Sequence, residues 1–172
     1  MINKYKLHFP KAVLLMMALF LVSFTATALP KIAVLDYELR DLTVLPGVPQ
    51  EIARTASVKT MLEEQLSKAG YGIVSIPREA QAQATAGFGY LFDHHDVAAK
   101  LGQQYNADYV LVGRLHKPSF LFVYLMAHLV DVKKQVLIAD YLSEVKGGDK
   151  KLTGKGVEDL VVKINKTFKD LQ

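Results

Sequence analysis

Residues 108–146, DYVLVGRLHKPSFLFVYLMAHLVDVKKQVLIADYLSEVK, decide the fold. Three runs rich in β-branched and aromatic residues, 108–117, 120–131 and 135–146, are separated by two short polar links. The links Pro118-Ser119 and Lys133-Lys134 are too short for a crossover, so they join antiparallel neighbours. The stretch therefore predicts a three-stranded antiparallel meander.

The flanking residues complete one domain, expected over residues 29–172. Residues 31–37 and 71–76 are short apolar runs typical of buried strands, and 51–69, 93–105 and the segment after Gly147-Gly148 carry helical spacing. A further turn of helix is possible near residue 80. The expected fold class is α/β (α+β), in the order β-α-β-α-β-β-β-α. We expect a single mixed sheet of about five strands, with the helices packed mainly on one face.

The first 28 residues have the layout of a cleaved secretory signal peptide. Lys4, Lys6 and Lys11 precede the uncharged run 12–24, and Ala26-Thr27-Ala28 is a small-residue cleavage site. The uncharged run is shorter than the roughly 20 residues of a membrane-spanning helix. We therefore expect the secretion machinery to engage the signal peptide, a periplasmic protein, and no transmembrane segment in the mature chain. The alternative is a short N-terminal anchor that is never cut.

Composition excludes several classes of function. Removing the expected signal takes away three of the 21 basic residues, which leaves 18 against 17 acids, a net charge of +1. A nearly neutral domain is a poor candidate for binding nucleic acid. The chain has no Cys, which excludes disulfides, thiolate metal sites and a Cys nucleophile. No phosphate-binding loop, nucleophile elbow or zinc-protease motif occurs, so we expect no cofactor and lean against an enzyme.

Two short motifs resemble a known family. They are VLDYELRD at residues 34–41 and ADYVLVG at residues 107–113. With the order of elements, they resemble a bacterial secreted family known only as a domain of unknown function. The resemblance implies a layout similar to the N-terminal domain of TolB and to envelope assembly proteins of the curli-secretion type. Relatives often carry a Cys pair before the middle helix and a Trp at the start of the last helix, and this chain has neither.

Two polar clusters are candidate sites. Asp93, His94, His95 and Asp96 are ligand types that suit zinc or copper. Neighbouring helical residues point about 100° apart, however, and the same stretch suits a helix start with Asp93 as N-cap and Asp96 at the third position.

The second cluster, Asp36, Glu38 and Asp41, follows the first strand. Ligands of open α/β sheets bind at the carboxyl ends of strands, and paired carboxylates can perform acid–base chemistry. The alternative is that these three are polar residues where a strand leaves the core.

Strand register gives a third candidate, an interaction face. With two-residue tips at both hairpins, aliphatic side chains collect on one face of the meander and aromatic ones on the other. The aromatic face would hold Tyr109, Phe120, Phe122, Tyr124, Met126, His128 and Tyr141. If helices cover only one side, this face is exposed, and we expect it to be a protein–protein or homodimer interface. The alternative is that a helix or long loop covers it.

These observations predict a non-enzymatic periplasmic domain that serves as an interaction or accessory module for an envelope protein or complex, or that self-associates. A periplasmic binder of a small solute or metal is the alternative, and an enzyme with an unrecognised site ranks below both.

Overall fold

The computed structural model describes residues 29–146 and 150–171, so the expected signal peptide lies outside the described residues. The strands are β1 (Lys31–Val34), β2 (Glu38–Asp41), β3 (Gly72–Val74), β4 (Tyr109–Lys117), β5 (Phe122–Asp131) and β6 (Val136–Lys146). The helices are α2 (Pro49–Lys68), α3 (Arg78–Ala84), α4 (Tyr90–Asp93), α5 (His95–Gln104) and α6 (Lys150–Asp170).

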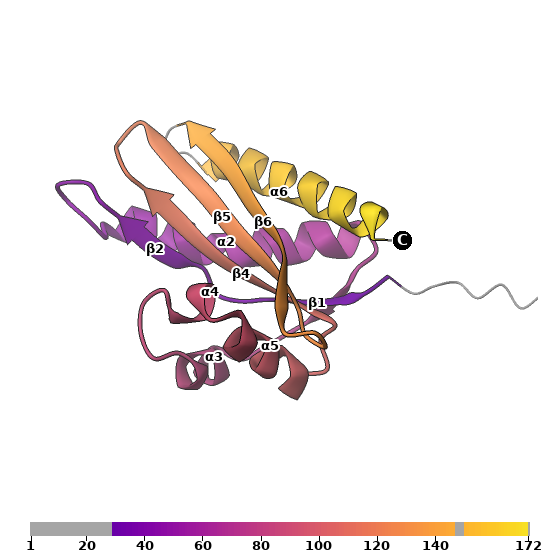
Figure 1. Ribbon diagram of the computed structural model, residues 1–172. Coiled ribbons are helices and arrows are strands. Elements are labelled where there is room, and N and C mark those ends of the chain that lie inside the picture. Colours follow the sequence, from indigo (N-terminus) through magenta and orange to yellow (C-terminus); the bar gives the residue numbers. More distant parts are fainter. Residues whose placement is uncertain (1–28, 147–149, 172) are drawn as a thin grey trace, which may run out of the picture.

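One mixed sheet organises the domain (Figure 1). Its strand order is β3-β1-β4-β5-β6. β2 also pairs with β4, further along that strand than β1 does. β1 runs parallel to β3 and β4, and β4, β5 and β6 form the antiparallel meander that the sequence predicts. The expected α+β fold with a C-terminal meander and helix is confirmed, with β2 as a sixth strand.

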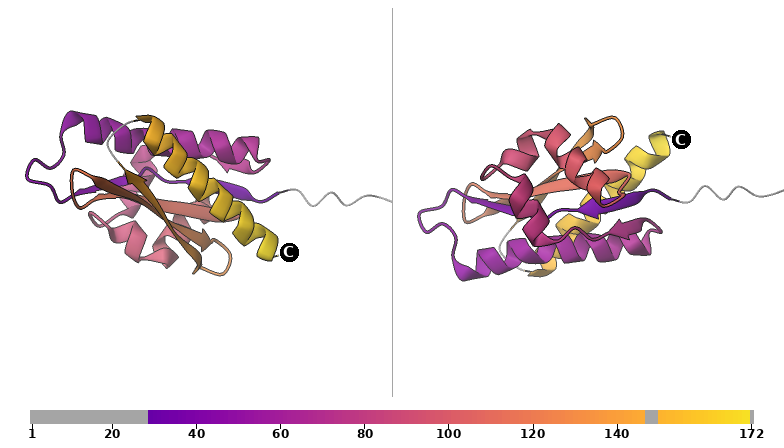
Figure 2. Two further views of the ribbon diagram at one scale, coloured as in Figure 1. Left: turned by 90° about the horizontal axis from the view of Figure 1, so that it is seen from above. Right: turned by 90° about the horizontal axis from the view of Figure 1, so that it is seen from below.

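Helices lie on both faces of the sheet (Figure 2). The two long helices, α2 and α6, share one face and bury the larger core cluster, which includes Leu62, Leu125 and Ile164. The short helices α3, α4 and α5 cover part of the opposite face, where Leu35, Phe92 and Val110 belong to a second cluster. Both faces are apolar under the helices because the central strands β1 and β4 are buried on both sides, as in other sheets with parallel crossovers.

An irregularity interrupts the line of β1 and β2 along β4. Val34 pairs with Leu111 and Glu38 with Arg114, so the chain advances four residues while β4 advances three. One extra residue makes a bulge, which re-aims the side chains that follow. Leu35 and Tyr37 therefore lie in opposite core clusters, although residues two apart in a regular strand share a face. Asp36, between them, is directed to the edge of the core.

The predicted register of the β4–β5 hairpin is wrong. A tip at Pro118-Ser119 would pair Tyr109 with His128, whereas the structure pairs Tyr109 with Asp131. The connection is wider than two residues because the Ser119 hydroxyl accepts hydrogen bonds from the backbone N–H groups of Leu121 and Phe122, both at 3.3 Å. Side chains alternate between the two faces of a strand, so a shift by three residues, an odd number, moves each β5 side chain to the face opposite the one predicted relative to β4.

The start of α5 also differs from the prediction. Asp93 is the last residue of α4, and the N-cap position of α5 is His94, which makes no side-chain capping hydrogen bond. The His94 ring stacks on Tyr90 at 4.1 Å, and its Nδ1 lies 2.9 Å from the Tyr90 carbonyl oxygen. The predicted Asp93 cap is therefore wrong, because residues 90–93 form a short helix of their own.

Candidate functional site

The residues of the predicted aromatic face lie on two sides of the sheet. Tyr141 is buried under α6, and its hydroxyl donates to Thr167 Oγ1 at 2.8 Å. The ring of Tyr109 packs edge-on against Phe168 of the same helix, with 4.9 Å between centroids. These two tyrosines therefore contribute to the core and not to a common exposed surface.

Phe122, Tyr124, Met126 and His128 share the opposite face, the side of α4 and α5. His128 stacks on Phe92 of α4 at 3.7 Å, so this end of the row is covered. Phe122 and Tyr124 extend beyond the helices, and Leu142 of β6, paired with Met126, joins them on this face. Leu142 joins these aromatic residues because β5 and β6 pair in a different register from the one predicted.

We call Phe122, Tyr124 and Leu142 the open face. Phe122 is 37% and Leu142 52% exposed, and Tyr124 is half-buried beside His116. The pairing partners of Phe122 and Tyr124 on β6 are Lys146 and Glu144, whose side chains form an ion pair of 4.0 Å. Apolar side chains with a charged rim, held on rigid strands, have the layout of a protein-binding surface.

The predicted metal cluster does not converge on one point. His94 turns to Tyr90, Asp96 pairs with Lys100 at 3.0 Å, and His95 Nε2 lies 3.1 Å from Nδ1 of His128. Within residues 29–146 and 150–171, no group of three or more His, Cys, Asp or Glu side chains is arranged to hold a metal ion.

The contact between His95 and His128 joins α5 to the sheet. The sequence analysis did not predict that these two residues meet. His128 Nδ1 also lies 3.0 Å from the Phe92 carbonyl oxygen, to which it donates as a neutral ring. Burial lowers the pKa of His128 below its ordinary value, in spite of that hydrogen bond and the charge of Asp140. His128 therefore acts as a neutral clamp between the sheet and the helices α4 and α5.

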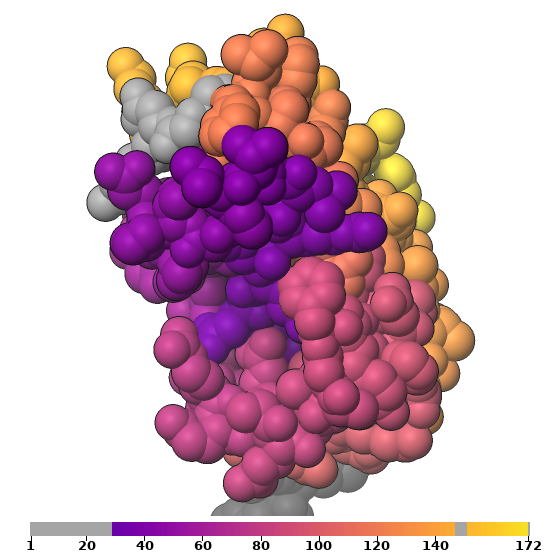
Figure 3. Space-filling model, turned by 90° about the vertical axis from the view of Figure 1, so that its left-hand side faces the viewer, coloured from indigo at the N-terminus to yellow at the C-terminus, as the bar shows by residue number. Residues whose placement is uncertain are grey.

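Two of the three predicted crevice residues line a real cleft. Asp36 and Glu38 face a hollow of about 400 Å³ between α2 and α3, at the carboxyl end of β1. Figure 3 shows this hollow below the indigo segment. Asp36 pairs with Arg78 at 2.9 Å and with Lys59 at 3.3 Å. Burial acts to raise the pKa of Asp36, but these two cations hold it below its ordinary value, so its charge is already neutralised.

The third predicted crevice residue, Asp41, does not line the cleft. Its carboxylate accepts hydrogen bonds from the backbone N–H groups of Thr43 at 3.0 Å and Gly47 at 3.1 Å. Burial acts to raise the pKa of Asp41, while these hydrogen bonds lower it below its ordinary value. Asp41 therefore shapes the loop that follows β2.

Glu38 is held in a network that the sequence analysis did not identify. Both of its carboxylate oxygens accept from the Gly89 N–H, at 2.8 and 3.0 Å, and Oε2 lies 3.6 Å from Arg114 Nη2. The Arg114 guanidinium lies over the rings of Phe88 and Phe92, at 5.1 and 4.4 Å. Arg114 follows an apolar run in β4, and this placement in the sequence could have indicated that it needs a buried acidic partner.

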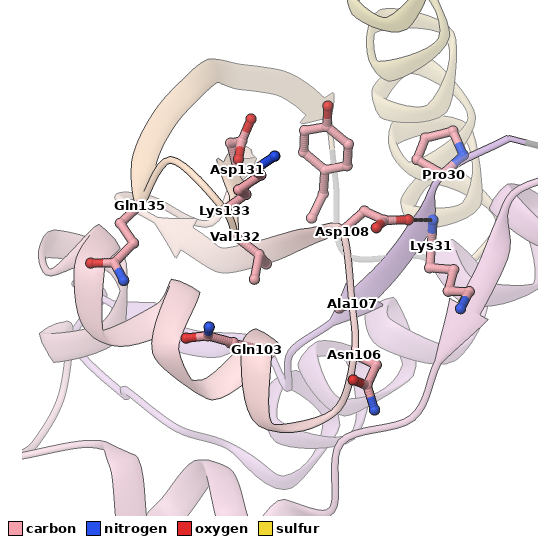
Figure 4. Close-up of a pocket in the computed structure, with 11 residues that line it drawn as sticks. Pro30, Lys31, Gln103, Asn106, Ala107, Asp108, Asp131, Val132, Lys133 and Gln135 are labelled. Atoms are coloured by element: carbon pink, nitrogen blue, oxygen red, sulfur yellow. Dashed lines mark hydrogen bonds between the residues drawn. The ribbon is translucent and has the colours of Figure 1, made fainter.

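A larger cleft of about 720 Å³ lies at the opposite end of the sheet (Figure 4). Its carboxylates are engaged by nearby backbone: Asp108 accepts from the Lys31 N–H at 2.7 Å, and Asp131 from the Lys134 N–H at 2.8 Å. These bonds fasten strand ends and a turn, so the lining has a structural role.

Several solved structures share the fold. Lipoprotein GNA1162 from Neisseria meningitidis is similar with a TM-score of 0.52 and 18% identity, over 79% of this chain and 96% of that one. The PelC dodecamer from Paraburkholderia phytofirmans has a TM-score of 0.50 and 16% identity, over 76% and 81%. Escherichia coli LpoB has a TM-score of 0.50 and 19% identity, over 85% and 75%. TolB from Acinetobacter baumannii is also similar, with a TM-score of 0.45 and 18% identity, over 78% and 27%.

Sequence comparison places the chain in a family. No protein of curated function matches it significantly. Across residues 29–146 and 150–171, no helix has both the length and the apolar character needed to cross a membrane. Residues 30–164 match the model of DUF3280, described as "Protein of unknown function (DUF2380)". The match covers most of the chain, in keeping with the resemblance of its motifs, and the protein therefore belongs to this family.

Proposed function

We propose that the protein is an accessory domain of the bacterial envelope that binds another envelope protein through the open face. The observation that carries the proposal is a part of the sheet that none of the described helices covers, where Phe122 and Leu142 are exposed on rigid strands. The envelope assignment is supported by the expected signal peptide and by the fold shared with a lipoprotein.

The open face has the physical properties that binding requires. Because the three side chains stand on paired strands, little backbone entropy is lost when a partner covers them. Their burial contributes roughly 25 cal/mol per Å² of apolar surface, and Tyr124 also offers a hydroxyl. Glu144 and Lys146 at the rim are partly or fully exposed and contribute to selectivity more than to affinity.

The cleft beside Asp36 supports a second candidate function, binding of a small solute. Its volume of about 400 Å³ falls within the range of small-molecule sites. Ligand-dependent stabilisation tests it, because a solute that binds only the folded protein raises the melting temperature by mass action. The mutation Arg78→Ala would remove an exposed cation from the cleft and should lower that shift.

Crosslinking in intact cells tests the first proposal. A photoreactive residue in place of Tyr124 should capture one reproducible envelope protein, and Leu142→Glu should abolish the capture. The matched control is Val162→Glu, since Val162 is an exposed apolar residue on α6, away from the open face. Capture that survives Leu142→Glu, or that is lost equally in both variants, would contradict the proposal.

A further inference from the structure

Two loops lie side by side at one end of the sheet, and we call them the end loops: residues 42–48 and residues 118–121. The first follows β2 and the second follows β4, and these strands are paired up to Asp41 and Lys117. The Leu42 N–H donates to the Lys117 carbonyl oxygen at 2.9 Å, which fixes the two loops together. Figure 3 shows this end, with the indigo loop beside the orange hairpin.

The end loops expose large apolar side chains. Val44 is 84% and Leu121 70% exposed, the two highest values among the exposed large hydrophobic residues. The remaining exposed apolar residues of the end loops are Leu42, Leu45 and Phe120. Connecting loops normally carry polar residues, and a cluster of exposed apolar ones marks a surface that binds something.

The first end loop has a defined shape. Asp41 holds it from within, with Oδ1 accepting from the Thr43 hydroxyl at 2.8 Å and Oδ2 from the Gly47 N–H at 3.1 Å. Gly47 has a φ of +70°, which allows the loop to return to α2. Val44 and Leu45 are therefore presented at the tip of a braced loop.

Three exposed basic residues lie near the end loops. Lys146 is the pairing partner of Phe122 at the base of the second loop, and Lys155 lies in the first turns of α6. Arg40, next to Asp41 in β2, is exposed as well. The carboxylate of Glu51 is already paired with Lys117 at 3.0 Å, and Asp41 is turned into its loop. Among the described residues, the exposed charge at this end is therefore mainly positive, with Glu144 as the exposed acid beside Lys146.

We propose that the end loops dock the protein on an anionic lipid surface. Apolar side chains on loop tips can enter the boundary between headgroups and acyl chains, while surrounding Lys and Arg residues contact lipid phosphates. Exposed apolar loop tips with basic residues nearby suit a fluid lipid surface, whereas apolar side chains held on paired strands suit a protein. The apolar residues of the two surfaces differ, although Lys146 borders both, so this inference does not depend on the proposed partner.

Fluorescence offers a direct test because the chain contains no Trp. Val44→Trp and Leu121→Trp each place a single reporter on one end loop. Val136→Trp is the matched control, since Val136 is exposed beside the β5–β6 turn, at the opposite end of the sheet. The probes are vesicles of phosphatidylglycerol and phosphatidylethanolamine, compared with vesicles of phosphatidylcholine alone.

We expect a blue shift of emission, and quenching by brominated acyl chains, for both end-loop reporters with anionic vesicles but not for the control. The shift should weaken in high salt, and Lys146→Glu with Lys155→Glu should lower vesicle affinity at least several-fold. An unshifted spectrum in both end-loop variants would overturn the proposal, as would an equal shift in the control or equal binding to phosphatidylcholine. Circular dichroism confirms that each variant is folded.

Discussion

Replacing Glu38 with Gln tests the network that ties residues 85–89 to the sheet. The wild-type carboxylate accepts from the Gly89 N–H with both oxygens and lies 3.6 Å from the Arg114 guanidinium. Gln keeps one neutral acceptor, so the hydrogen bond weakens by about 1 kcal/mol, the difference between charged and neutral acceptors. Arg114, whose side chain is only 9% exposed, also loses its counter-charge.

Leaving a fully buried charge unpaired costs about 3–5 kcal/mol. Glu38 is one-quarter exposed and two aromatic rings still contact Arg114, so we scale this cost to about 1–2 kcal/mol. The expected loss in the free energy of unfolding is therefore about 2–3 kcal/mol. For a domain of this size, that lowers the melting temperature by roughly 5–10 °C.

Urea and thermal unfolding of the purified protein measure this loss, with Glu64→Gln as the control because Glu64 is exposed on α2. A double-mutant cycle with Arg114→Met should give a coupling energy of about 1–2 kcal/mol. Hydrogen exchange at the Gly89 amide should accelerate in Glu38→Gln. The reasoning is refuted if Glu38→Gln melts within 1 °C of wild type by the same assay, roughly the effect of a neutral surface change, or if the coupling energy is zero.

Three further perturbations follow from particular contacts. Gly113→Ala would place a Cβ in steric overlap with the buried Tyr37 ring, so we expect a loss of about 1–3 kcal/mol in urea unfolding; an unchanged midpoint would contradict this. Burial depresses the pKa of His128 in the fold, so its contribution to stability is present above 6.5 and is lost as the pH falls below that value. His128→Asn should therefore flatten the loss of stability between pH 7 and 5, and an unaltered slope would refute the clamp. Asp36→Asn removes the Arg78 pair and should cost about 1 kcal/mol or less at pH 7. Since the pKa of Asp36 is lowered in the fold, that difference should shrink once the pH falls below 3.8, whereas a constant gap would contradict the ion pair.

The architecture could be predicted from the sequence because periodicity and short links dominate it. The run from residue 108 to 146 specifies three neighbouring strands whatever their exact pairing, and the helical spacing after Gly147-Gly148 specifies α6. β2 was missed because Glu38, Arg40 and Asp41 are polar, and their pairing with β4 depends on a strand far along the chain.

The candidate site was harder to predict because it depends on register and on contacts between distant segments. The Ser119 hydroxyl supports a wider hairpin loop, and the pairing of β4 with β5 therefore differs from the predicted register. The pairing of Val130 with Leu137 at the second hairpin was predicted correctly, but an irregularity at Leu129 shifts the rest of that ladder by one residue. The contact of His95 with His128 spans 33 positions, and no local pattern indicates it.

The parallel pairing of β1 has a consequence for how the chain folds. Lys31 pairs with Gly72, and Ile32 pairs with Tyr109, 77 positions later in the chain. The first strand to be synthesised is thus an inner strand, and one of its two partners, β4, follows only after β3 and three helices, which raises the contact order and slows folding. The sheet cannot close until β4 is available, so most of the polypeptide must exist before any stable core forms.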